Sequence, residues 1–150
     1  MAENLFPVFD MPAEMVADTR NTSVYATAPM WDFNTGDFMV NNARQPVYGT
    51  GYDAWLLWCR KSLSTQRFVH LAYSDNFGIE IAEAFAEPDS KAQESAIERT
   101  VSEALLADPS GRTQQVRDFI FEWHEDSLRV TCMIIGYDGN SAVIDADIRI

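Results

Sequence analysis

The C-terminal part of the chain constrains the fold most strongly, because three strand-like runs follow one another with only short connections between them. The runs cover residues 116–123, 128–135 and 141–150, and the connections at 124–127 and 136–140 are rich in turn-forming residues. Short turns of this kind join neighbouring antiparallel strands. The sequence therefore predicts an antiparallel meander at this end of the chain.

The final run alternates between apolar and charged residues, which is typical of a strand with one buried face. Its apolar positions are Ile144, Ala146, Ile148 and Ile150, and its charged positions are Asp145, Asp147 and Arg149. An edge strand leaves backbone N–H and C=O groups unpaired, so we expect this strand to pair with a strand of a partner. The charged side chains would restrain self-association before the partner arrives.

The first run differs, since bulky apolar residues occupy successive positions. Phe119, Ile120, Phe121 and Trp123 would place apolar groups on both faces of the strand. A small antiparallel sheet usually needs only one apolar face. We therefore expect one face to pack on helices, and the apolar pattern leaves open what covers the other.

A hairpin at 30–40 and two helices are predicted before the meander. The first helix covers about residues 52–65. The second begins at a cap on Asp89 or Ser90 and ends before Pro109, since the residue before a proline avoids helical geometry. Their apolar stripes consist of Tyr52, Trp55, Leu56, Cys59 and Leu63 in the first helix and of Ile97, Val101, Ala104 and Leu105 in the second. The predicted fold class is α+β, a small and mainly antiparallel sheet with two packed helices.

Leu57 and Trp58 lie outside the stripe of the first helix, toward its charged side. A neighbouring Leu and Trp off the core face have two explanations. Either they form a second contact surface for a partner, or the helix is buried on two sides within its own domain.

Residues 1–30 are predicted to form an extended arm ahead of a single domain at 31–150. The arm has no sustained periodicity, yet it contains large apolar groups. Such an arm packs on its own domain or docks on a partner, and both alternatives stay open here. The residues expected to dock are Leu5, Phe6, Pro7 and Phe9.

Composition excludes several classes of partner. The chain has 11 basic and 23 acidic residues, a net charge of −12, whereas nucleic acids and anionic membranes bind cationic surfaces. No run is long and apolar enough to span a bilayer, and the N-terminus does not resemble a secretion signal. Cys59 and Cys132 lie far apart in apolar surroundings, so we expect reduced core thiols in a protein that folds in a cytoplasm.

Residues that carry chemistry are scarce. His70 and His124 are the only histidines, and neither lies at a metal-ligand spacing. We therefore expect that the protein binds no metal and no cofactor and that it is not an enzyme. The best candidates for an acid/base pair are Glu80, Glu83 and Glu87, but such a pair needs one carboxyl group in an apolar pocket. An acidic surface explains these glutamates more simply.

Several segments resemble one family in their order and spacing. They are NLFPVFDMP at 4–12, WDFNTGDF at 31–38, GYDAWLLWCRKSL at 51–63, RFVHLAYSDNFGIEI at 67–81, ERTVSEALLADP at 98–109 and VRDFIFEW at 116–123. The family is the baseplate wedge, or sheath-initiator, protein of contractile phage tails, in the form found in prophage-like elements and phage-tail-like bacteriocins of Gram-positive bacteria. The resemblance covers nearly the whole chain and is weakest at residues 10–30 and in the last strand.

The resemblance implies a structural function in a baseplate assembled in the host bacterial cytoplasm. Proteins of this family form a six-fold ring around the tail tube, link wedge proteins to the first sheath ring, and template sheath assembly by strand exchange. The implied partners are baseplate wedge proteins and the tail sheath protein, with hub or tube proteins as further candidates. The arm would dock on a wedge protein, and Leu57 and Trp58 would add a second contact.

The broader family carries a Glu-Pro-Arg signature where the second helix turns into the sheet. Asp108, Pro109 and Ser110 stand at the matching positions here, so the arginine is missing. If the family arginine clamps a partner carboxylate in a bidentate fork, Arg112 would have to reach the same space. The resemblance implies that this corner lies at the wedge junction.

Two other functions stay open from the sequence. One is a tail-associated muralytic, lysozyme-like enzyme that uses Glu80 or Glu83. The other is a free-standing dimeric binding module unrelated to tails.

Overall fold

The computed structural model describes residues 27–149 of the chain. Ile150 and the predicted docking residues of the arm lie outside this range, so the division into an arm and a domain stays a prediction. The elements in chain order are β1 (Ala28–Pro29), β2 (Trp31–Asp32), β3 (Asp37–Phe38), β4 (Tyr48–Gly49), α1 (Gly51–Leu63), α2 (Ile81–Phe85), α3 (Ser90–Leu106), β5 (Thr113–Trp123), β6 (Ser127–Gly136) and β7 (Ser141–Arg149).

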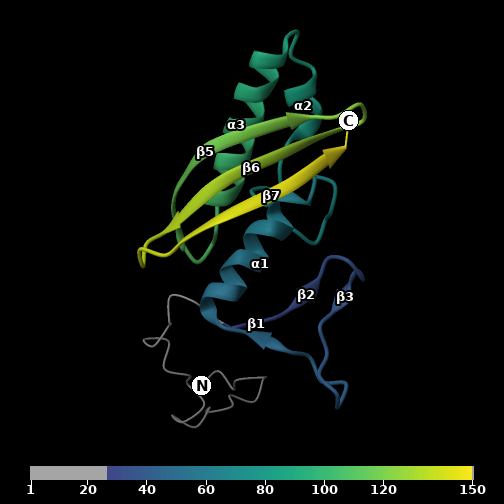
Figure 1. The fold of residues 1–150 in the computed structure, drawn as a ribbon, viewed down its shortest axis with the longest axis vertical. Coiled ribbons are helices and arrows are strands. Elements are labelled where there is room, and N and C mark those ends of the chain that lie inside the picture. Colours follow the sequence, from purple (N-terminus) through teal and green to yellow (C-terminus); the bar gives the residue numbers. More distant parts are fainter. Residues whose placement is uncertain (1–26, 150) are drawn as a thin grey trace, which may run out of the picture.

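The main sheet has three antiparallel strands in the order β5-β6-β7, which confirms the predicted meander and the α+β class. All three helices lie on one face of this sheet, behind it in Figure 1. Helix α1 crosses behind β7 and continues past the sheet toward the small two-stranded ribbons. The opposite face of the sheet is therefore left without a covering layer among the described residues.

The core lies between the sheet and the helices, and the alternation of β6 shows which face is buried. Leu128, Val130, Cys132 and Ile134 are buried, whereas the residues between them are not. They pack against the predicted stripes of α1 and α3, whose buried members include Trp55 and Leu105. Burial raises the pKa of both thiols, Cys59 and Cys132, to about 12, so they stay protonated at neutral pH.

The helix starts follow from local hydrogen bonding. Thr50 and Asp53 form a capping box at the start of α1, because the Thr50 hydroxyl accepts from the Asp53 N–H and the Asp53 carboxylate accepts from the Thr50 N–H. Of the two candidates for the cap of α3, Asp89 fills the position and accepts from the N–H of Ala92. Helix α2 was not predicted, because five residues are too few to show helical periodicity.

Two small ribbons complete the fold beside α1 (Figure 1). Strands β2 and β3 form the predicted hairpin, in which Trp31 and Phe38 meet edge to face with ring centroids 5.0 Å apart. Strand β1 pairs with β4. Residues 28–29 therefore belong to the folded part of the chain, although the sequence places them in the arm.

The apolar residues of β5 lie on both faces, as predicted, but a bulge places most of them on the helix side. The register shifts between Arg117 and Ile120, and Asp118 adopts a positive φ of 58°. The extra residue turns Phe119 back toward the helices, so it lies on the same side as Val116 and Phe121. Trp123 also faces that side, where its indole N–H donates to Glu94 on α3. Ile120 is the large apolar residue of β5 that lies on the open face of the sheet, where its cross-strand neighbour on β6 is Thr131.

We expect the backbone at Asp118 to decide the stability of this bulge. Asp118→Val should lower the free energy of unfolding by about 1–2 kcal/mol, because a β-branched residue is strained at positive φ. Asp118→Gly should leave it unchanged or raise it, since glycine adopts this conformation freely. Urea denaturation of the two variants measures the difference. Equal effects would show that the backbone conformation is not the cause.

Candidate functional site

The two edges of the main sheet differ in regularity. Strand β7 pairs with β6 without a register shift along its whole length, whereas β5 is interrupted by the bulge at Asp118. Bulges are one of the means by which proteins block unwanted pairing at an edge strand. Of the two edges of the main sheet, that of β7 is therefore the regular one.

The hydrogen-bonding pattern shows which backbone groups β7 presents at this edge. The Gly136 N–H donates to the Asn140 carbonyl at 2.8 Å, which identifies these two residues as a hydrogen-bonded pair. Because hydrogen-bonded and non-hydrogen-bonded pairs alternate, every second residue of β7 turns its N–H and C=O away from β6. These residues are Ser141, Val143, Asp145, Asp147 and Arg149, and the Ser141 carbonyl accepts from the Tyr52 hydroxyl. No described strand pairs with them on the outer side.

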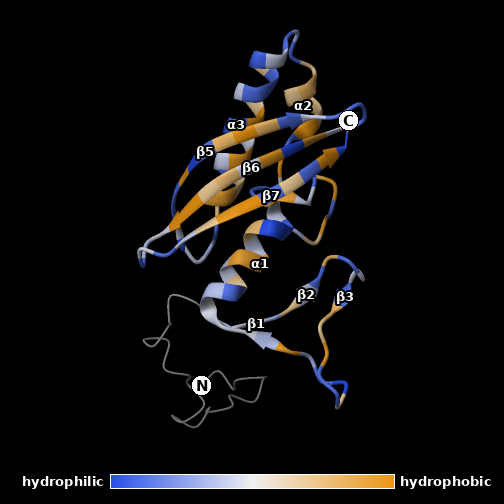
Figure 2. Cartoon of the chain, viewed as in Figure 1, coloured by the Kyte–Doolittle hydropathy of each residue, from blue (hydrophilic) through white to orange (hydrophobic). Residues whose placement is uncertain are grey.

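The open face of the sheet is divided into an apolar half and a charged half, and Figure 2 shows this change along β6 and β7. The apolar half lies near the β6–β7 turn and includes Val143, which is 61% exposed. The charged half lies at the other end. Its cross-strand pair of Arg129 and Asp147 has N–O distances of 2.8 and 3.1 Å in a bidentate fork.

The Arg129–Asp147 fork lies toward the C-terminal end of the edge strand. The hydrogen bond from Arg129 holds the pKa of the Asp147 carboxyl below its usual value. Asp147 is therefore ionised at neutral pH, and both residues are solvent-exposed. Charged side chains exposed on an edge strand are one means by which proteins hinder unwanted edge-to-edge pairing.

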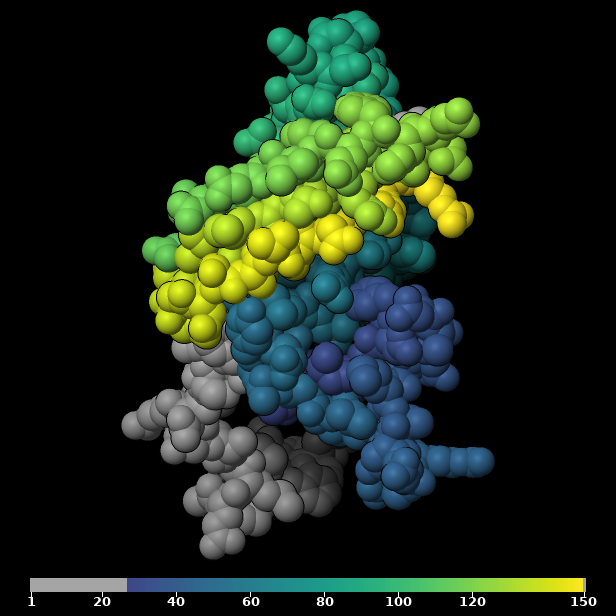
Figure 3. Space-filling view, viewed as in Figure 1, coloured from purple at the N-terminus to yellow at the C-terminus, as the bar shows by residue number. Residues whose placement is uncertain are grey.

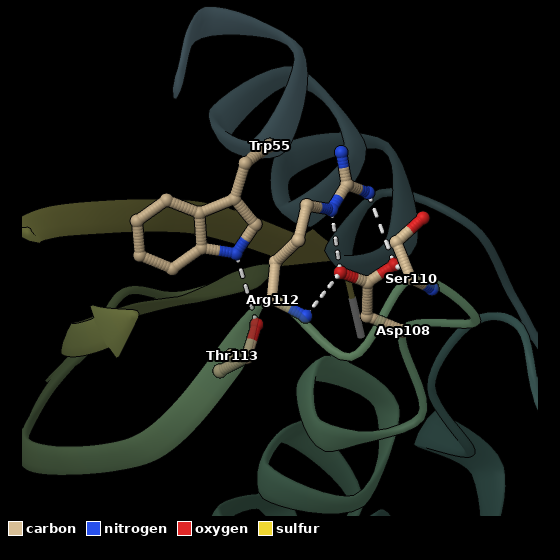
Figure 4. A network of polar contacts seen from close by, with 5 residues as sticks. All are labelled: Trp55, Asp108, Ser110, Arg112 and Thr113. Carbon is tan, nitrogen blue, oxygen red and sulfur yellow. Dashed lines mark hydrogen bonds and ion pairs between the residues drawn. The ribbon is translucent and has the colours of Figure 1, made fainter. Parts of the chain in front are cut away.

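A second arrangement occupies the corner between α3 and β5 (Figure 4). Arg112 donates to the Asp108 carboxylate through Nε at 2.6 Å and Nη2 at 3.0 Å. The same carboxylate accepts from the backbone N–H groups of Ser110 and Arg112 itself, both at 3.1 Å. Asp108 and Arg112 are each only 6% exposed. Arg112 therefore directs its fork at a carboxylate of its own chain rather than into solvent.

The corner connects most of the domain. The Arg112 carbonyl accepts from the Tyr137 N–H beyond the end of β6, and Thr113 accepts from the buried Trp55 indole of α1 at 2.9 Å (Figure 4). The Arg112 guanidinium also lies over the Trp58 ring, 5.9 Å from its centroid. One ion pair thus holds α3, the start of β5, the end of β6 and α1 together.

Leu57 and Trp58 contact the protein's own domain. Leu57 is 9% exposed and faces the β1–β3 region, where it lines shared hollows with Trp31. Trp58 is half-buried between Arg112 and Phe77. The rings of Trp58 and Phe77 meet edge to face, with their centroids 5.8 Å apart. Burial on two sides within the domain, the second of the two explanations, accounts for both residues.

The structure reveals an exposed apolar loop that the sequence did not single out as a contact surface. Phe68 is 67% exposed, Val69 is 56% exposed and Leu71 is fully exposed. Tyr73 and Phe77, whose rings are 4.7 Å apart, link this loop to Trp58. The sequence feature that could have indicated this loop is the apolar run RFVHLAY at 67–73. Its apolar residues follow neither the pattern of a buried strand nor that of an amphipathic helix. Clusters of this kind mark interaction surfaces.

The acid/base candidates do not form a cleft. Glu80 forms an ion pair with Arg67 at 3.8 Å, and Glu83 and Glu87 are exposed. The hollow that Glu80 and Glu83 share has a volume of about 170 Å³, below the ~300–1,000 Å³ usual for ligand sites. Within residues 27–149, no group of three or more His, Cys, Asp or Glu side chains is placed to hold a metal ion.

Comparison with known families supports the structural function among those left open by the sequence. The family described as "contractile injection system sheath initiator" matches residues 28–139, most of the chain. The chain belongs to this family. No curated protein matches it. The matched region begins at β1 and ends in the β6–β7 turn, so it includes the Asp108–Arg112 corner and leaves β7 outside.

Membership of the family establishes the general role. A sheath initiator is a structural component of a contractile tail or injection system, located in the tail or baseplate, and functions with sheath and baseplate proteins. The resemblance to sheath initiators is confirmed. In the part of the chain that the structure describes, no helix is long and apolar enough to cross a membrane.

Removal of one member of the corner ion pair should be costly. Arg112→Met leaves the buried Asp108 carboxylate without its counter-ion, and such a change costs about 3–5 kcal/mol of folding free energy. Arg117→Met is the matched control, because Arg117 pairs with Asp118 at 3.4 Å on the exposed surface, where ion pairs contribute less than about 1 kcal/mol. Chemical denaturation measures both. A cost below about 1 kcal/mol for Arg112→Met would show that the corner does not hold the domain together.

Proposed function

We propose that this sheath initiator starts sheath assembly by offering the outer edge of β7 to a strand of the first sheath subunit. The observation that carries the proposal is the asymmetry of the sheet: β7 is flat and unpaired on its outer side, whereas β5 has a bulge. The outward backbone groups of β7 give an added strand a continuous row of hydrogen-bonding partners.

The proposed junction derives its strength from repetition. Each cross-strand side-chain pair contributes only ~0.2–1 kcal/mol, so a single added strand binds weakly. A ring of initiators around the tail tube presents many such edges at once, and linked contacts raise the overall affinity well above that of one contact. The ring also fixes the positions of the first sheath subunits.

On the baseplate side, we assign the exposed apolar loop as a contact for a wedge protein. Phe68, Val69 and Leu71 project from it, and the aromatic contacts through Tyr73, Phe77 and Trp58 connect it to the Asp108–Arg112 corner. Exposed apolar side chains on an ordered support are typical of the anchors of protein interfaces. Leu5, Phe6, Pro7 and Phe9, which lie outside the described residues, remain the predicted docking residues of the arm on a wedge protein.

The edge contact can be tested without removing β7. A chain ending at Asn140 is unsuitable, because it would lose Ile144 and Ile148, which are 1% and 3% exposed. Asp145→Pro deletes one outward N–H and leaves the hydrogen bonds to β6 intact, and proline is tolerated at such edge positions. We expect the variant to keep its thermal midpoint within a few degrees and to lose capture of the co-expressed cognate sheath protein.

Asp145→Asn is the control for this test, since it keeps the N–H and nearly the same side-chain volume. It should capture sheath protein as the parent chain does. If Asp145→Pro folds and captures the sheath protein at the parent level, the outer edge of β7 is not the contact.

A further inference from the structure

A hollow of about 390 Å³ lies along the free edge of β7. Three elements form its walls: the β2–β3 turn, the C-terminal end of α1, and the middle of β7. The lining residues are Phe33, Asn34, Arg60, Ser64, Asp145, Ala146 and Asp147. Figure 3 shows the purple β2–β3 hairpin beside α1, on the side of the yellow strand β7 that faces away from β6.

The geometry of β7 places this hollow at the strand edge. Successive side chains of a strand point to opposite faces, so three consecutive residues, Asp145, Ala146 and Asp147, line one hollow only where it meets the edge. A strand added to β7 would therefore run through the hollow. Its side chains on the helix face would come close to Ala146, which is small, and to the last turn of α1.

Arg60 is the charged residue that the last turn of α1 contributes to the hollow. Its side chain is exposed and has no ion pair or hydrogen bond within the described residues, in a chain with 23 acidic and 11 basic residues. The neighbouring Lys61 differs, because its ammonium group lies 5.7 Å from the centroid of the Trp31 ring. Arg60 is thus a guanidinium without an ion pair among the described residues, and it borders the hollow together with Asp145 and Asp147.

We propose that Arg60 reads an acidic side chain in the sheath strand that joins β7. This side chain lies on the helix face of the added strand, opposite Ala146, and its carboxylate pairs with the guanidinium. The pairing fixes the register of the added strand, because a shift by one residue would turn the acidic group to the other face. It also excludes a second copy of β7, whose helix-face positions Ile144, Ala146 and Ile148 are apolar. The inference rests on the proposed function of the β7 edge.

The test measures the half-saturating concentration of cognate sheath protein on the immobilised full chain. Arg60→Gln should raise it about 10- to 100-fold, the range expected for loss of one charge-assisted hydrogen-bonded contact. Lys61→Gln is the matched control, since it removes the other cation of the same helical turn and leaves the hollow unchanged. It should change the concentration less than twofold. A general effect of charge at the helix end would weaken both variants equally and would overturn the inference.

A charge exchange identifies the partner group. Arg60→Glu should abolish capture, and changing one acidic residue of the added sheath strand to Lys should restore it. If Asp145→Pro abolishes capture while Arg60→Gln has no effect, the inference fails and the β7 edge contact stands. If neither variant affects capture, both fail. Circular dichroism of each variant verifies that the chain is folded.

Discussion

The rest of the structure depends on the buried ion pair between Asp108 and Arg112. It closes the corner between α3 and β5, and the same short segment bonds to the end of β6 and to Trp55 of α1. Removing either charge would leave the other buried without compensation. In this chain the bidentate fork of Arg112 is directed at Asp108 of the same domain. The predicted contact of this corner with a wedge protein stays a prediction.

The two edge strands of the main sheet, β5 and β7, differ in regularity. The bulge at Asp118 turns the apolar residues of β5 toward the helices and interrupts that edge. Strand β7 stays flat, and no described strand pairs with its outer side. A flat open edge of this kind is the basis of the function proposed above.

Much of this fold could be predicted from the sequence, because periodicity and turn signals are local. The meander, both long helices and the hairpin followed from such patterns. The bulge did not, since an aspartate at positive φ leaves no mark on apolar alternation. The side-chain partner of Arg112 and the hollow at Arg60 also escaped prediction, because each depends on how distant segments meet. The matched family region ends before β7, so this edge must be judged from its own geometry.

Amide hydrogen exchange, resolved to single residues, tests the central claim most directly. In the free protein, the outward amides of Val143, Asp145 and Asp147 should exchange fast, whereas those of Ile144 and Ala146, which bond to β6, should be protected. In the complex with cognate sheath protein, the three outward amides should become protected. If they continue to exchange at the free rate while protection appears in β5 instead, the account of the β7 edge is contradicted.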